Sequence, residues 1–130
     1  MQEKEAIALY PSFVRHSHIA ELGRQPYRTA EKTALQALQR SAGGDAQSDV
    51  PVSVSWVEDY GKLQVHRRAV YCPARELLYT QYKETPPTVY RGVSLEGITA
   101  ALQTDTRAPM AAAQTFSFRT MVEMARFNGS

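Results

Sequence analysis

Two runs of alternating residues, joined by a turn, constrain the fold of this chain more than any other feature. In residues 50–57, valines and a tryptophan alternate with mostly small or polar residues, which is the period of a half-buried strand. Residues 63–71 restart the alternation, and the Asp-Tyr-Gly-Lys segment at 59–62 has the composition of a turn. The pattern predicts a β-hairpin built from these two runs.

The sequence before the hairpin has helical periodicity. Residues 3–10 predict a short helix that Pro11 ends, and residues 12–22 predict a second helix. Thr29 is expected to cap a third helix, so that the region 1–45 is predicted to be helical. The apolar stripe of the third helix consists of Ala30, Ala34, Leu35 and Leu38.

The sequence after the hairpin mixes helical and extended segments. Residues 74–83 predict a helix, and two prolines after it force an extended entry into a strand at 88–91. Ser94 is expected to cap the next helix, residues 115–119 alternate like a strand, and a capping box at Thr120 predicts a final helix. The stripe of the helix after Ser94 consists of Leu95, Ile98, Ala101 and Leu102.

Together these elements predict an α+β fold. N-terminal helices come first, and a small mixed or antiparallel sheet with flanking helices follows. A length of 130 residues suits one domain, here a helical region at 1–45 and an α+β core at 50–130. The same elements also fit the first part of a larger fold, so a longer natural chain is an open alternative.

Composition removes several classes of function. A net charge of +2, from 15 basic and 13 acidic residues, argues against non-specific binding to nucleic acid. The densest basic group, residues 66–68, is expected to be a solvated strand face. The one cysteine, Cys72, excludes an internal disulfide and a multi-thiolate zinc site, and no metal is predicted. No run approaches the ~18 apolar residues of a membrane span, and the polar N-terminus is unlike a Sec signal, which leaves a secreted effector and a cytoplasmic protein open.

One segment has the residue types of a dinucleotide site. Tyr90, Arg91 and Gly92 close the strand predicted at 88–91, and Ser117 lies on the strand predicted at 115–119. An arginine at the end of one strand and a serine on a second can together hold a dinucleotide, because a guanidinium fork meets phosphate oxygens at two points. Glycine frees the backbone for a sharp exit from the strand.

The order of these elements over residues 86–128 resembles the mono-ADP-ribosyltransferases of the arginine–serine–glutamate group, which includes bacterial toxins and effectors. The resemblance implies part of that fold, NAD as substrate and a protein as acceptor. It implies that Arg91 binds the NAD phosphates and ribose, with Tyr90 before it and Gly92 after it. It also implies that Ser117 shapes the nicotinamide pocket, where Tyr90 or Phe116 walls the ring.

The residue that would catalyse such a transfer is not assigned. The family places a Glu-x-Glu or Gln-x-Glu pair on a strand after its serine motif, and the sequence has none after Ser117. Glu123 lies in a predicted helix and does not take that role. We therefore expect an ADP-ribosyltransferase-like domain that is active only if the chain continues.

Two other classes remain open. One is a non-catalytic protein-binding module, an effector adaptor or chaperone-like protein, in which the hairpin at 50–71 offers a strand edge to a partner. The other is a weak nucleic-acid binder that uses residues 66–68 and nearby aromatic side chains. Arg91 and Ser117 would then be an ordinary surface arginine and the polar residue of a solvated strand face.

Overall fold

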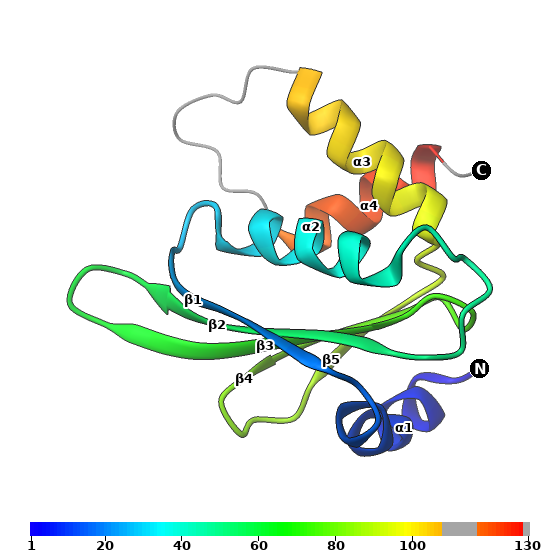
Figure 1. Ribbon diagram of the computed structural model, residues 1–130, viewed down its shortest axis with the longest axis horizontal. Helices are drawn as coiled ribbons and strands as arrows, with labels where there is room; N and C mark the ends of the chain where they lie inside the picture. The colour runs from blue at the N-terminus through cyan, green and yellow to red at the C-terminus, as the bar shows by residue number, and fades with distance from the viewer. Residues whose placement is uncertain (108–116, 129–130) are drawn as a thin grey trace.

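The computed structural model describes residues 1–107 and 117–128, and Figure 1 shows how their helices and strands are arranged. In chain order the elements are α1 (Glu3–Arg15), β1 (Ile19–Pro26), α2 (Ala30–Ala42), β2 (Val52–Asp59), β3 (Gln64–Cys72), β4 (Leu77–Tyr82), β5 (Thr88–Arg91), α3 (Leu95–Arg107) and α4 (Phe118–Asn128).

The strands form one mixed sheet in the order β1-β2-β3-β4-β5. β1 runs parallel to β2, with α2 as the crossover between them, and the other neighbours are antiparallel. The α+β class and the mixed sheet predicted from the sequence are confirmed. The hairpin is confirmed too: β2 pairs with β3, and its turn closes through a 2.9 Å bond from the Tyr60 amide to the Leu63 carbonyl.

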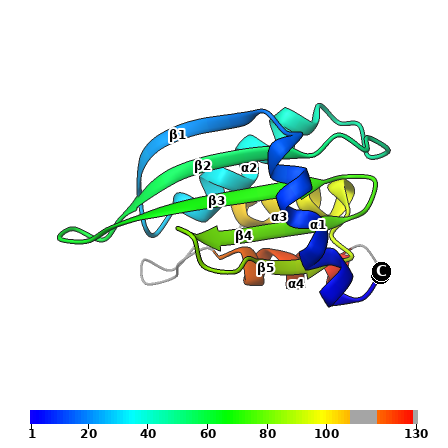
Figure 2. The same cartoon turned by 90° about the horizontal axis from the view of Figure 1, so that it is seen from below.

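Helices cover both faces of the sheet, but unequally. α2, α3 and α4 lie on one face, and α1 alone lies on the other (Figures 1 and 2). The stripes predicted for α2 and α3 are buried in the larger core, together with Trp56 and Phe118. Burial of each such large side chain contributes about 1.5–3 kcal/mol, so this face carries most of the stability. The smaller core joins Tyr10 and Phe13 of α1 to Val70, Tyr79 and Val89 of the sheet.

α1 covers only part of its face. Figure 2 shows that the end of the hairpin extends well beyond the helix. Side chains alternate along a strand, so the next row on this face lies two residues beyond Val70 and Tyr79. That row contains Ser55, Arg68 and Gln81, which pair in register across β2, β3 and β4. This row is polar and not fully buried, as an uncovered sheet surface should be.

The first predicted helix boundary was wrong. α1 continues through Pro11, which is exposed, while Ala6, Tyr10 and Phe13 anchor the helix on the sheet. Proline removes only its own amide donor, and burial of the apolar side compensates for that loss.

Two segments predicted to be helical are strands. Residues 19–26 form β1 rather than the end of a helix, so the region 1–45 is not wholly helical, and Gly23 adopts a positive φ of 72° at an irregularity in the pairing with β2. The helix predicted at 74–83 is replaced by β4, whose residues 77–80 are all buried. β4 lies between β3 and β5 with helices on both faces, and a strand buried on both faces loses its alternation.

The elements after β4 follow the prediction more closely. The strand at 88–91 is β5, and the Ser94 hydroxyl accepts a 2.9 Å bond from the Gly97 amide at the start of α3. α3 continues to Arg107, beyond the predicted stripe, which ends at Leu102. None of the helices in the described part of the chain is long and apolar enough to cross a bilayer.

Candidate functional site

Arg91 does lie at the end of a strand, but its guanidinium faces the α1 side of the sheet. Its Nη1 donates a 3.0 Å hydrogen bond to the carbonyl of Met1. Val89, two residues earlier, packs in the α1 core, whereas Tyr90 packs against the core on the opposite face. Gly92 has a positive φ of 73°, as a sharp exit from the strand requires.

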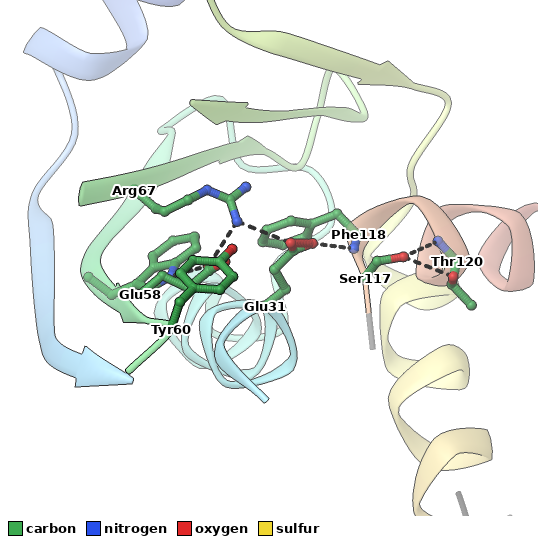
Figure 3. Close-up of polar contacts among 8 residues, drawn as sticks. Glu31, Glu58, Tyr60, Arg67, Ser117, Phe118 and Thr120 are labelled. Carbon is green, nitrogen blue, oxygen red and sulfur yellow. Dashed lines mark hydrogen bonds and ion pairs between the residues drawn. The ribbon is translucent and has the colours of Figure 1, made fainter. Parts of the chain in front are cut away.

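Ser117 is not on a strand. It precedes α4 and caps it, because its Oγ accepts a 3.1 Å bond from the Thr120 amide and lies 2.8 Å from the Thr120 hydroxyl (Figure 3). The strand predicted at 115–119 is therefore wrong for residues 117–119, and the helix begins at Phe118 rather than Thr120. Phe116 lies outside the described residues.

The structure does not bring the predicted dinucleotide clamp together. α4 contacts α2 and α3, on the face of the sheet opposite α1. Ser117 thus begins a helix on one face while the Arg91 side chain lies on the other. No described cavity contains both residues. The resemblance to ADP-ribosyltransferases gains no geometric support from this placement.

A buried ion-pair cluster forms instead around Arg67, which was predicted to be on a solvated face. Its side chain is only 2% exposed, and Nη1 donates to Glu58 Oε2 at 2.9 Å and to Glu31 Oε2 at 3.1 Å (Figure 3). Arg67 alternates with Val65 and Ala69, so it points to the same face as the main core. The cluster joins β3 to β2 and to the first turn of α2.

Neutral donors complete the cluster. Glu58 accepts a 2.9 Å bond from Trp56 Nε1 and a second bond from the Tyr60 hydroxyl. Glu31 Oε1 accepts a 2.8 Å bond from the Phe118 amide, which is the first amide of α4. Two carboxylates face one guanidinium, and these three donors stabilise the extra negative charge.

The pKa values in the cluster follow from burial and charge. Burial alone would lower the pKa of Arg67, but the charges of Glu31 and Glu58 outweigh it and raise that pKa above its usual value. Burial and the hydrogen bond to Glu58 raise the pKa of the Tyr60 hydroxyl. The Arg67 guanidinium and the Tyr60 hydroxyl therefore keep their protons across the physiological range.

Three exposed tyrosines, Tyr27, Tyr60 and Tyr82, lie around this cluster, and we refer to them as the tyrosine row. They are 37%, 42% and 45% exposed. The rings of Tyr27 and Tyr60 stack with centroids 5.0 Å apart and planes 16° apart. The guanidinium of Arg67 lies 3.9 Å from the centre of the Tyr82 ring, and the Tyr60 hydroxyl is held by Glu58. Buried charges thus fix aromatic rings that face solvent.

A cavity of about 590 Å³ adjoins the row. Tyr27 and Tyr60 line it together with Arg24 and Arg28, and Arg28 Nε donates a 3.1 Å bond to the Tyr27 hydroxyl. Leu63, in the loop between β2 and β3, is 62% exposed. Aromatic, arginine and leucine side chains are thus concentrated at the hairpin end of the sheet.

The thiol of Cys72 is buried, and burial raises its pKa, which disfavours the nucleophilic thiolate. No group of three metal-ligating side chains occurs in residues 1–107 and 117–128. Glu31 and Glu58 already accept hydrogen bonds from several donors. The exposed part of the site presents tyrosine and arginine side chains, which are common at binding interfaces.

The sequence contained only a weak signal for this site. Glu31 and Arg67 are 36 positions apart, and nothing local indicates that they meet. The aromatic residue in the hairpin turn, Tyr60, could have indicated an exposed ring, because turns lie at the surface. Comparison with protein-family models, curated proteins and solved structures found no match.

Proposed function

We propose that this chain is a non-catalytic protein-binding module that docks a partner protein on the tyrosine row. One observation carries the proposal: Tyr27, Tyr60 and Tyr82 are exposed, yet each ring is held in place by a stacked ring or a buried charge. Side chains that are already ordered lose little conformational entropy when a partner binds. Tyrosine and arginine are also the residue types that most often dominate binding energy at interfaces.

The distribution of exposed apolar side chains supports the same surface. Of six large exposed ones in the described residues, four lie at the hairpin end. The other two, Met1 and Val50, lie elsewhere in the chain. A cluster of this kind is typical of an interaction site, whereas scattered exposed residues are not. The four are Tyr27, Tyr60, Leu63 and Tyr82.

The mode of binding differs from strand addition. The hairpin at 50–71 was expected to offer a free strand edge, but β1 pairs with β2 and β4 pairs with β3, so neither strand is an edge. A partner therefore meets side chains at the end of the sheet. The ADP-ribosyltransferase expectation needs Arg91 and Ser117 in one cleft, and for that reason it is not the function proposed.

The test begins with photo-crosslinking of the full chain in cells of its source, with a photoreactive phenylalanine analogue in place of Tyr27. The same analogue at Val50, which is 63% exposed, is the matched control. A partner captured at position 27 and absent at position 50 is then purified. Its affinity is measured for the wild type, Tyr27→Ala, Tyr82→Ala and Val50→Ala.

We expect each tyrosine substitution to weaken binding by about 30-fold, the scale of a 2 kcal/mol interface residue. Val50→Ala should leave the affinity unchanged. Circular dichroism checks that each variant is folded. A partner whose affinity is the same for all four proteins would show that it binds elsewhere, and the proposal would then be wrong.

A further inference from the structure

The uncovered half of the α1 face contains a second cavity, of about 630 Å³. It opens on the face of the sheet opposite the buried cluster, although Trp56 and Arg67 of that cluster are among the residues that line it. Its floor includes Ser55, Arg68 and Gln81, side by side on β2, β3 and β4. Tyr10 of α1 borders it, because the Tyr10 hydroxyl donates a 2.7 Å bond to Gln81 Oε1.

Arg68 is the unusual residue of this groove. It is half-buried, and its Nε is inaccessible to solvent and has no hydrogen-bond partner. Within the described residues Arg68 forms no ion pair. The Nε of its neighbour Arg67 is also buried without a partner, but the Arg67 side chain points to the opposite face, where its Nη1 pairs with two carboxylates. A partly desolvated guanidinium without an anion is costly, and a bound anion would remove that cost.

Two further side chains with basic groups lie beside Arg68. His66 lies two residues earlier on the same face of β3, and the Lys83 amide donates a 2.9 Å bond to the His66 carbonyl, which places the two residues side by side. Burial raises the pKa of Tyr10, and the adjacent charge of Arg68 partly offsets this effect. The positive charges of the groove are thus concentrated over β3 and β4.

Acidic residues limit the size of an anion that fits. Glu21 lines the groove on β1, two strands away from Arg68, and Glu84 lines it after β4. A polyanion such as nucleic acid would extend over these carboxylates and be repelled. A single small oxyanion would contact only the basic centre. The distribution of charge therefore selects one anionic group rather than a chain of them.

We propose that this groove binds one oxyanion, a carboxylate or a phosphate monoester, through the guanidinium of Arg68. Both groups present paired oxygens that match the arginine fork. His66 and Lys83 supply further donors at the rim, and the Ser55 hydroxyl and the Gln81 amide are the neutral groups nearest to Arg68 in the register.

Nuclear magnetic resonance can test this directly, because each arginine gives its own Nε–H signal. The ¹⁵N-labelled chain is titrated with acetate, phenyl phosphate or inorganic phosphate, with sodium chloride at equal ionic strength as the control. We expect the Arg68 Nε–H signal to shift saturably with acetate, with the phosphates, or with both, and that result distinguishes the two ligand classes. The Nε–H of Arg119 on α4, which does not line the groove, is the internal control and should not move.

Variants at two positions of the groove keep the test from depending on Arg68 alone. Arg68→Lys keeps the charge and loses the fork, and it should weaken binding about tenfold, the scale of one charge-assisted hydrogen bond. Lys83→Asn removes a rim charge with a residue that tolerates the positive φ of 45° at this position, and it should weaken binding several-fold even if Arg68→Lys fails to fold. Arg119→Lys, at a position whose side chain is 82% exposed and lies outside the groove, is the neutral control.

Two results would overturn the proposal. One is a wild-type Arg68 signal that does not respond to any of the three anions beyond the chloride control. The other is a shift of equal size at Arg119 and at other exposed arginines, which would show general ion association. Neither result would bear on partner binding by the tyrosine row, because the two surfaces lie on opposite faces of the sheet.

Discussion

Replacement of Arg67 by methionine tests whether the buried ion pairs hold the fold together. Methionine fills a similar volume, so the change removes charge and hydrogen bonds more than it removes packing. It leaves Glu58, with a side chain 3% exposed, and Glu31, 16% exposed, without their shared cation. The remaining donors to the two carboxylates are neutral: Trp56, Tyr60 and the Phe118 amide.

The expected cost is large. Removal of one partner from a buried pair typically destabilises a protein by about 3–5 kcal/mol, because the other charge stays buried. A domain of this size has a total stability of roughly 6–20 kcal/mol, at about 0.05–0.15 kcal/mol per residue. The loss corresponds to a fall of roughly 10–20 °C in melting temperature.

The assay is urea unfolding followed by circular dichroism. Arg119→Met is the matched control, since the Arg119–Glu123 pair is exposed at 82% and 68% and should contribute less than about 1 kcal/mol. The double variant Arg67→Met/Glu58→Gln should recover at least about 1 kcal/mol, because it removes one uncompensated charge. If Arg67→Met costs no more than Arg119→Met, the cluster does not stabilise the fold and the reasoning is refuted.

Three further predictions concern other parts of the fold. Burial raises the pKa of the Tyr79 hydroxyl to about 12, from about 10 in an unfolded chain. The stability that the neutral hydroxyl contributes is therefore complete below pH 10 and is lost as the pH rises toward 12. Unfolding titrations should show a shallower loss over that range for Tyr79→Phe. Ser117→Ala should destabilise the protein by about 1 kcal/mol in urea, because α4 loses its cap. NAD should leave the melting temperature of the wild type unchanged. A rise in melting temperature that Arg91→Ala abolishes would instead support NAD binding by Arg91.

The parts of the fold that were predictable depend on local signals. The stripe of α2, the hairpin with its turn and the Ser94 cap each follow from residues close together in the sequence. β1 and β4 were missed because their identity depends on neighbours. β1 is a strand because it pairs in parallel with β2. The sequence of β4 is compatible with a helix, and it is the pairing with β3 and β5 and the helices on both faces of the sheet that make it a strand.

The candidate site was less predictable, for a related reason. Tyr90, Arg91 and Gly92 were correctly placed at the end of a strand, and Gly92 has the positive φ that it was expected to need. Ser117 was read as a strand residue because phenylalanines flank it, yet its hydroxyl is a helix cap. Which face of the sheet each residue occupies depends on where α1 and α4 pack, and the local pattern does not contain that information.

The basic residues at 66–68 have different environments because side chains alternate between the two faces of the sheet. Neighbouring strand residues point to opposite faces, so a run of three basic side chains cannot form one patch. Arg67 enters the main core, where two carboxylates pair with its Nη1 and the Tyr82 ring lies against its guanidinium. Arg68 enters the open face, where no carboxylate of the described chain pairs with it. The arginine with ion pairs orders a surface for a partner, and the arginine without an ion pair faces the groove proposed to bind an anion. A single residue slip in β3 would exchange these roles and bury the unpaired charge in the core, so the register of the hairpin determines both proposed functions.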